Sequence, residues 1–446
     1  MNETRLTVKQ KLGFGIFDLG GNMFFTLMSF WALKYLTDTV GIAAAWAGFA
    51  VMAGKAWDAV SDPMMGFISD RTLSRWGRRR IYLLFGAVPM MLSMFFFFTA
   101  PAYLPSSFHI AWAVVALMLI NTASTVINVP YASLTPELTS DYNEQSSLNG
   151  YRFGCAVFGT IAGAGAVEPL VRLFARPGSA NPLSDPRGFS VMGLILGSVM
   201  MIVTLLTFLG TKEKKYRKED LPTESFFSTF GVVLHNKAFV ILLATYALHM
   251  TGISFLTSIL AYYTNNVLGR GDITTIALLL LLLTAMLFIP VSVLVSKKIG
   301  KMRTYQICFV VLASACGIIY FLGHRLPVEF FYVMMVYAGI GVGFSYVAPF
   351  AMIPDVIEFD AAKTGVRKEG AYYGVWTFVS KTGAALAIFI SGQILELGGY
   401  ISQAGEAAVQ PPSVFNAVRF IVGPLPMLVL IAAVVVVNFY PLDKNR

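Results

Sequence analysis

Residues Trp57–Arg80 read WDAVSDPMMGFISDRTLSRWGRRR, and this stretch decides the fold class of the chain. It begins as an apolar segment that contains Asp58 and Asp62, and it ends in a cluster of arginines. Because the two acids are four positions apart, a helix places them on one face, one turn apart. The apolar flanks predict that this helix lies in a bilayer, where a charged side chain costs at least about 2.5–3.5 kcal/mol. We therefore expect the acids to be functional and to hold a proton or a cation between them.

The composition extends this prediction to the whole chain. Of its 446 residues, 56% are hydrophobic and only 13% are charged, whereas soluble domains average about 25% charged residues. The chain is therefore predicted to be a polytopic membrane protein. The first apolar stretch starts near Leu12 and has no small-residue cleavage site after a short apolar core, so we interpret it as a retained helix and not as a signal peptide.

Apolar runs of about 20 residues predict twelve transmembrane helices. Their centres lie near residues 25, 55, 90, 120, 160, 198, 250, 284, 312, 342, 383 and 428. The longest polar interruption, TKEKKYRKEDL at Thr211–Leu221, follows the sixth run. The predicted fold is thus an all-α membrane protein of two six-helix halves, the major facilitator architecture. We place the N-terminal half at 1–211, a cytoplasmic central loop at 212–237 and the C-terminal half at 238–446.

The net charge of +9 follows a topological pattern. Most of the 33 lysines and arginines fall in alternate loops of the twelve-helix scheme, which predicts a cytoplasmic (inner) membrane protein with both termini in the cytoplasm. The excess positive charge therefore does not indicate a nucleic-acid partner. We expect a monomer in the bilayer that takes a small-molecule substrate.

The sequence carries no pattern typical of catalysis. It lacks a nucleophile elbow, an HExxH motif and a Walker loop, and its four histidines and three cysteines have no metal-ligand spacing. We expect no enzyme activity and no cofactor other than a coupling ion, Na⁺ or H⁺.

A few polar residues interrupt the apolar runs, and each must pair or line a wet cavity. The main ones are Asp18, Asn22, Lys55, Asp58, Asp62, Asn121, Thr125, Asn128, Arg152, His249 and Lys381. Lys381 is the natural counter-charge for the two acids if the halves meet at a central cavity. Alternatives stay open: Lys55 or Arg152 balances an acid only, and His249 serves in packing. Glycines at 150, 154, 159 and 163 have a small-xxx-small spacing that predicts close helix contact.

Several motifs resemble those of one family over nearly the whole chain. They are GFGIFDLGGN (13–22), YLTDTVGI (35–42), KAWDAVSDPMMGFISDRTLSRWGRRR (55–80), NVPYASLTPELTSDYNEQSSLNGYR (128–152), PDVIEFDAAKTGVRKEGAYYG (354–374) and SKTG (380–383). The chain resembles the glycoside–pentoside–hexuronide:cation symporters of the major facilitator superfamily. The most specific of these marks is WDxxxDP followed by SRWG and basic residues.

The resemblance implies roles for residues near the acid pair. Asp58 and Asp62 would be the cation-binding carboxylates, with Na⁺ as one candidate ion, and Ser61 and Thr125 would contribute oxygens. Lys381 would be the basic partner from the other half. Lys55 lies where the family often has arginine, next to the same acids.

The resemblance also implies a substrate site. Asn22 and Asn128 lie where a galactoside-carrying member has two aspartates that hold sugar hydroxyls, and Arg152 matches the family's arginine. Asp18, one turn from Asn22, is placed in the same site. Ala132 replaces a tryptophan that stacks near the galactosyl ring, so the departures argue against a galactoside. A sugar or sugar acid remains the first choice, because amides can donate to and accept from hydroxyls.

Charged residues at the predicted cytoplasmic ends of the helices are candidates for a gate that closes this side in the outward-open state. They are Asp70, Arg71, Arg78, Glu137, Asp141, Asp355, Glu358 and Arg367. The alternative is that the arginines serve topology alone.

Three functions are compatible with these features. The first is symport of a sugar-like solute (glycoside, pentoside or hexuronide) with Na⁺ or H⁺ by alternating access. The second is symport of a lysophospholipid or another amphiphile, because the family includes lysophosphatidylcholine symporters that keep the cation acids and lose the sugar aspartates. The third is a facilitator-fold sensor that transports nothing, against which the costly buried charges argue.

Overall fold

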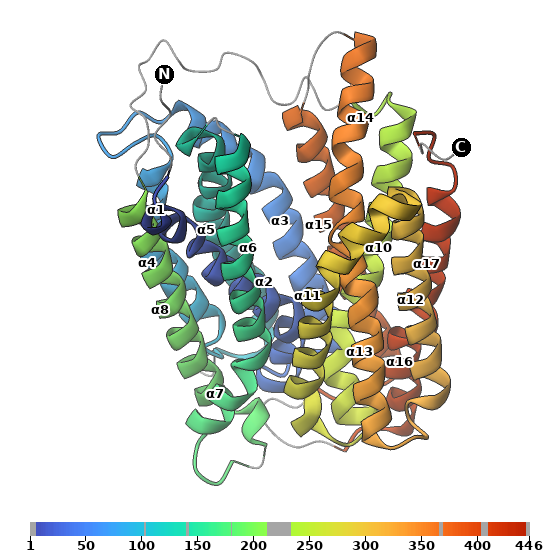
Figure 1. Cartoon of the computed structure of the whole chain (residues 1–446). Helices are drawn as coiled ribbons and strands as arrows, with labels where there is room; N and C mark the ends of the chain where they lie inside the picture. Colours follow the sequence, from blue (N-terminus) through green and yellow to red (C-terminus); the bar gives the residue numbers. More distant parts are fainter. Residues whose placement is uncertain are drawn as a thin grey trace. The chain divides into compact units, whose positions relative to one another are not determined.

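The computed structural model describes residues 6–101, 104–139, 142–179, 181–211, 233–364, 369–402 and 409–442. These residues form helices joined by turns, and no strand occurs among them. The helices of the first part are α1 (Val8–Gly15), α2 (Phe17–Lys34), η1 (Tyr35–Thr39), α3 (Ala44–Arg71), α4 (Arg80–Phe97), η2 (Ser106–Phe108), α5 (His109–Leu138), α6 (Tyr142–Gly165), α7 (Val167–Phe174), η3 (Pro182–Ser184) and α8 (Pro186–Gly210). Those of the second part are α10 (Lys237–Tyr262), η5 (Tyr263–Val267), η6 (Gly271–Ile273), α11 (Thr274–Ile299), α12 (Lys301–Leu322), α13 (Val328–Ser345), α14 (Ala348–Thr364), α15 (Glu369–Leu397), α16 (Pro412–Val422) and α17 (Pro424–Val437) (Figure 1).

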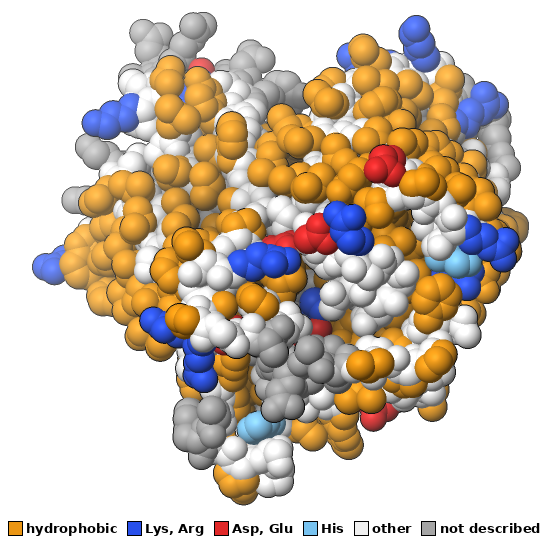
Figure 2. Space-filling model, turned by 90° about the horizontal axis from the view of Figure 1, so that it is seen from below, with side chains coloured by type: hydrophobic (Ala, Val, Ile, Leu, Met, Phe, Trp, Pro, Cys, Tyr) orange, Lys and Arg blue, Asp and Glu red, His pale blue; other side chains and the backbone are white. Residues whose placement is uncertain are grey.

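The predicted all-α membrane fold is confirmed, and each of the twelve predicted centres falls within a helix. The length and hydropathy of the described helices do not reproduce the predicted count of twelve transmembrane spans. Ten described helices are long and apolar enough to cross a membrane, or eleven if the pair α6–α7, bent by 42°, is one span. Helix α3 is not among them, because Lys55, Asp58 and Asp62 lower its mean hydropathy. Figure 2 shows hydrophobic side chains over much of the surface in view.

The chain divides into two compact units. The first contains residues 1–42, 53–224 and 402–408, and the second contains residues 43–52, 225–401 and 409–446. The first turns of α3 are thus grouped with the second unit, where Gly48 approaches Gly392 of α15. The domain boundaries at 211 and 238 stay a prediction, because residues 212–232 of the central loop lie outside the described residues.

Glycines bring α6 against α2 in the first unit. A Cβ at Gly159 would overlap the carbonyl oxygen of Leu19, and a Cβ at Gly163 would overlap that of Met23. The prediction of close helix contact is therefore confirmed for these two glycines. It is wrong for Gly150 and Gly154, which have nothing within 4 Å of a Cβ position, because they lie on a face of α6 that does not meet α2. This contact fixes the rotation of α6, the helix that carries Arg152.

An internal repeat links the ends of α2 and α10. Each helix continues into a π-helical turn, η1 or η5, and then into a glycine with positive φ, Gly41 (80°) or Gly269 (64°). The backbone bonds match as well: Ile42 N donates to Leu36 O at 2.9 Å, and Arg270 N donates to Thr264 O at 2.9 Å. The two units therefore share a local structure at the end of these helices.

Candidate functional site

Helices α3 and α5 bring the predicted cation residues together. Thr125 Oγ1 of α5 lies 2.8 Å from Asp58 Oδ1 and 2.8 Å from Asp62 Oδ1 of α3. Ser61 Oγ lies 3.3 Å from the same threonine hydroxyl and donates to the carbonyl of Asp58 at 3.3 Å. Asp58 and Ser61 are each only 8% exposed. Two carboxylates and two hydroxyls thus share one largely buried place in the first unit.

The geometry around Thr125 has a chemical consequence. A hydroxyl carries one hydrogen, so Thr125 can donate to only one carboxylate at a time. Its second short contact is favourable when the other carboxyl carries a proton, or when a cation lies among the oxygens and offsets their repulsion. The oxygen donors also suit a hard cation. The cluster can therefore hold either H⁺ or a small cation, which is the chemistry that coupling requires.

The two lysines lie on different units. Lys55 lies on α3 three residues before Asp58, so the two side chains are neighbours on the helix surface. Lys381 lies in α15 of the second unit and is partly exposed. The role of Lys381 as counter-charge to the acid pair stays a prediction.

A second cluster joins three helices of the first unit. Arg152 of α6 donates from Nε to Asp18 Oδ2 of α2 at 2.7 Å and from Nη2 to Asp18 Oδ1 at 3.3 Å, a two-point ion pair. Tyr131 of α5 donates its hydroxyl to the same carboxylate, and the guanidinium lies 4.9 Å from the centre of the tyrosine ring. The aspartate and arginine side chains are 15% and 24% exposed. The charge of the arginine is therefore balanced within the protein.

The two predicted sugar amides lie close to this cluster. Asn22 donates to the carbonyl of Asp18 at 2.8 Å, and Asn128 donates to the carbonyl and hydroxyl oxygens of Ser124, both at 2.9 Å. A Cβ at Gly21 would lie 3.4 Å from Asn128 Oδ1, so this amide faces α2 beside Asn22. Each amide nitrogen donates a hydrogen bond within its own helix. The amide oxygen can accept a hydrogen bond from another group, such as a hydroxyl.

Helix α5 connects the two clusters. Thr125 and Asn128 are three residues apart, which places their Cβ atoms about 5–6 Å apart on one helix face. A shift of α5 that moves the Thr125 oxygen at the cation site must therefore also move the amide of Asn128. Tyr131 lies in the motif NVPYASL but is not among the site residues predicted from the sequence. Its partner Asp18 is distant in sequence, so no local signal marks it.

Two of the gate candidates, Asp70 and Asp355, form ion pairs within their own units. Asp70 Oδ1 pairs with Arg79 Nη2 at 2.8 Å, and Arg78 donates to the carbonyl of Asp70 at 3.5 Å. Asp355 pairs with Lys301 at 2.6 Å. Arg71 lies over the ring of Phe67 at 3.5 Å, and Glu358 lies exposed on α14. The side chains of Glu137, Asp141 and Arg367 lie outside the described residues. The gating role of the set stays a prediction.

One buried ion pair was missed from the sequence. Lys34 Nζ lies 2.5 Å from Asp38 Oδ2 where α2 passes into η1, and the two side chains are 6% and 2% exposed. Thr37 donates to the second carboxylate oxygen at 2.8 Å. The signal was the same i, i+4 spacing of charges in an apolar run that marked Asp58 and Asp62.

Metal-ligand clusters are absent from the described residues, where no group of three or more His, Cys, Asp and Glu residues converges. His249 instead lies fully buried in the second unit, with Nδ1 3.0 Å from the hydroxyl of Tyr305.

Comparison with known proteins identifies relatives along the whole chain. Residues 13–444 match the profile of the family described as MFS/sugar transport protein. The uncharacterized symporter sll1374 of Synechocystis sp. is 28% identical, over 100% of this chain and 96% of that protein. The isoprimeverose transporter of Lactiplantibacillus pentosus is 25% identical (98% and 89% covered), and the glucuronide carrier protein homolog of Escherichia coli is 25% identical (100% and 95% covered).

Solved structures give the same fold. A bacterial homologue of the human lysosomal transporter Spinster, inward-facing and unoccupied, has a TM-score of 0.70 at 14% identity, covering 97% of this chain and 95% of that chain. At this identity the likeness shows the fold alone.

Proposed function

Because the chain belongs to the family of MFS/sugar transport proteins, we propose that it moves an uncharged sugar-like solute together with Na⁺ or H⁺ by alternating access. Like the proteins of this family, it is a multi-pass membrane transporter and not an enzyme. We place it in the cytoplasmic (inner) membrane with both termini in the cytoplasm, in line with the positive-inside rule. Its relatives include a symporter and a sugar transporter, which supports coupling to a cation.

One observation carries the proposal: Thr125 touches both acids, and Asn128 lies one turn along the same helix. A cation among the oxygens of Asp58, Asp62 and Thr125 fixes α5 relative to α3, and a sugar hydroxyl on Asn128 uses the same helix. Each ligand then favours the conformation that the other needs, and such coupling is reciprocal. Ser61 adds a further oxygen to the cation site, while Lys55 on the same helix supplies a counter-charge.

The charge balance at Arg152 supports an uncharged substrate. Its guanidinium makes a two-point ion pair with Asp18, so the site formed with Asn22 and Asn128 has no excess positive charge. An anionic sugar would face the Asp18 carboxylate, whereas a hydroxyl can bond to the amides. A glycoside or pentoside therefore fits these residues better than a hexuronide.

The experiment that tests the substrate is a titration of Asn128→Ala in purified protein with alkyl glycosides and with lysophospholipids of increasing chain length. Without the Asn128 amide, a buried sugar hydroxyl loses its hydrogen-bond partner, which costs about 1–3 kcal/mol. We therefore expect the sugar affinity to fall about 5- to 150-fold and cation binding to stay nearly unchanged. Asn266→Ala is a matched control, because this amide lies in η5 of the second unit. A small effect of Asn128→Ala together with affinity that climbs with chain length would favour an amphiphile instead.

Coupling is tested separately in proteoliposomes. Asp62→Asn removes one charge from the cation site, so we expect it to abolish cation-driven accumulation while downhill exchange survives. A tenfold gradient supplies about 1.4 kcal/mol and 100 mV supplies about 2.3 kcal/mol per charge. Undiminished uphill uptake by the variant would contradict the assignment, and absence of any uptake by the wild-type protein would favour a sensor.

We also propose that the ion pairs Asp70–Arg79 and Asp355–Lys301, each within one unit, contribute to the gate at the arginine-rich end. Because Arg79 contacts the Asp70 carboxylate, Arg79→Ala should shift the population toward the inward-open state more than Arg78→Ala. Cysteine-accessibility labelling of residues at this end measures the shift. Equal labelling in both variants and the wild type would leave these arginines with a topological role only.

A further inference from the structure

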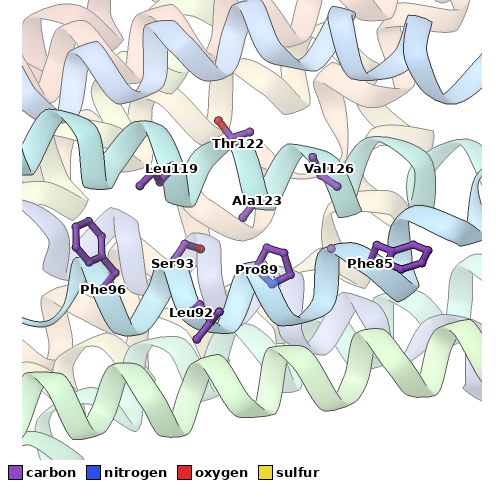
Figure 3. Close-up of a pocket in the computed structure, with 10 residues that line it drawn as sticks. Phe85, Pro89, Leu92, Ser93, Phe96, Leu119, Thr122, Ala123 and Val126 are labelled. Carbon is purple, nitrogen blue, oxygen red and sulfur yellow. The ribbon is translucent and has the colours of Figure 1, made fainter.

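A groove runs along the outside of the first unit between α4 and α5. Its volume is about 430 Å³ and its lining is almost wholly apolar. Figure 3 shows Pro89 and Ser93 of α4 facing Leu119 and Ala123 of α5. Ser93 and Ala123 are 9% and 7% exposed and form the floor, whereas Leu119 is 49% exposed and forms part of the rim. The groove is therefore open on the apolar surface of the protein.

Local sequence explains why the groove exists. Helices α4 and α5 meet at Gly86, where a Cβ would overlap Ile127. Away from this contact, Pro89, Ser93 and Ala123 have too little side chain to fill the space between the helices. The larger side chains Phe85 and Leu92 point outward instead, at 60% and 53% exposure. Because small residues form the floor and large residues form the rim, an open groove remains between the two helices.

The dimensions fit one acyl chain. The α4 residues that line the groove run from Phe85 to Phe96, which is about 16 Å at 1.5 Å per residue. Half of a hydrocarbon core of roughly 30 Å has nearly the same length. The lined length of the groove is therefore close to the thickness of one leaflet of a bilayer.

Basic and aromatic residues lie at the arginine-rich end of the groove. The ring of Trp76 lies 6.0 Å from that of Phe85, and the guanidinium of Arg75 lies 4.2 Å from the centre of the Trp76 ring. Arg75 is exposed, whereas Arg79 is turned to Asp70. Tryptophan and arginine at a membrane interface are typical of contacts with lipid headgroups.

We propose that this groove is a binding site for an anionic phospholipid, with an acyl chain between α4 and α5 and its phosphate at Arg75 and Trp76. The apolar groove supplies the affinity for the chain, and the exposed guanidinium supplies the preference for negative charge. The site is separate from the residues assigned to the sugar and the cation, so it is a place for a bound lipid and not for the transported substrate.

The proposal is tested by native mass spectrometry of the full chain, loaded with phosphatidylglycerol or phosphatidylcholine. Ser93→Phe fills the groove, with Ala123→Leu as a milder second variant, and Ser198→Phe adds the same bulk to a partly exposed position on α8. Arg75→Gln removes the charge and keeps the groove. Since a basic residue near a membrane surface contributes about fivefold in binding, Arg75→Gln should lower the preference for phosphatidylglycerol by about that factor.

Each outcome decides the proposal. Loss of the retained lipid in Ser93→Phe and Ala123→Leu, with retention in Ser198→Phe and a reduced headgroup preference in Arg75→Gln, supports it. Equal lipid retention in the filled-groove variants overturns it, as does an unchanged headgroup preference in Arg75→Gln. Sugar uptake is not needed for this readout, so the proposed function and the lipid site can fail independently.

Discussion

Thr125→Val is the substitution that most directly tests the cation cluster. Valine has nearly the shape of threonine but lacks the hydroxyl, so the change removes the contacts at 2.8 Å to Asp58 and Asp62 and leaves the helices in place. Only one of these contacts is favourable without a bound proton or cation, so the bound state loses one interaction with a charged group more than the free state does, about 1.5–3 kcal/mol. We therefore expect the cation affinity to fall about 10- to 150-fold.

The assay is sugar uptake into proteoliposomes over a matrix of Na⁺ concentration and pH. If Na⁺ is the coupling ion, the half-saturating Na⁺ concentration rises in the variant; if H⁺ is, the pH at which uptake is half-maximal moves down. Thr125→Ser should restore most of the affinity, because serine returns the hydroxyl. Thr204→Val is the matched control, since this buried threonine of α8 donates to the carbonyl of Met200 in its own helix.

An unchanged dependence on both ions in Thr125→Val would refute the reasoning. A similar change in Thr204→Val would also refute it, because the effect would then follow from any lost buried hydroxyl. A melting temperature close to that of the wild type separates lost cation binding from lost folding.

Three further predictions concern stability and protonation. Lys34→Met removes the ammonium 2.5 Å from the buried Asp38 carboxylate and should cost roughly 3–5 kcal/mol of unfolding free energy in detergent, most of which the double variant with Asp38→Leu should recover. Gly159→Leu should lower the melting temperature because a Cβ there overlaps the backbone of α2, whereas Gly154→Leu should be tolerated. Outside the spans, partial burial and two nearby arginines lower the pKa of His324 below its ordinary 6.5, so the neutral imidazole persists to lower pH and its NMR titration midpoint should lie below that value.

The sequence alone determined the helices, the membrane class and the acid pair. Apolar runs of about 20 residues are a local property, so the twelve centres could be read without knowledge of neighbours. The i, i+4 spacing of Asp58 and Asp62 likewise puts both on one face whatever surrounds the helix. The motifs around them predicted the family over the whole chain.

Tertiary structure alone decided which distant groups meet. The contact of Tyr131 and Arg152 with Asp18 joins three helices, and it depends on how each helix is rotated and shifted along its axis. Rotation also decides which glycines of α6 contact α2, because only the face that carries Gly159 and Gly163 meets that helix. Rotation and register follow from the sum of many weak side-chain contacts between helices, and no short stretch of sequence contains that sum.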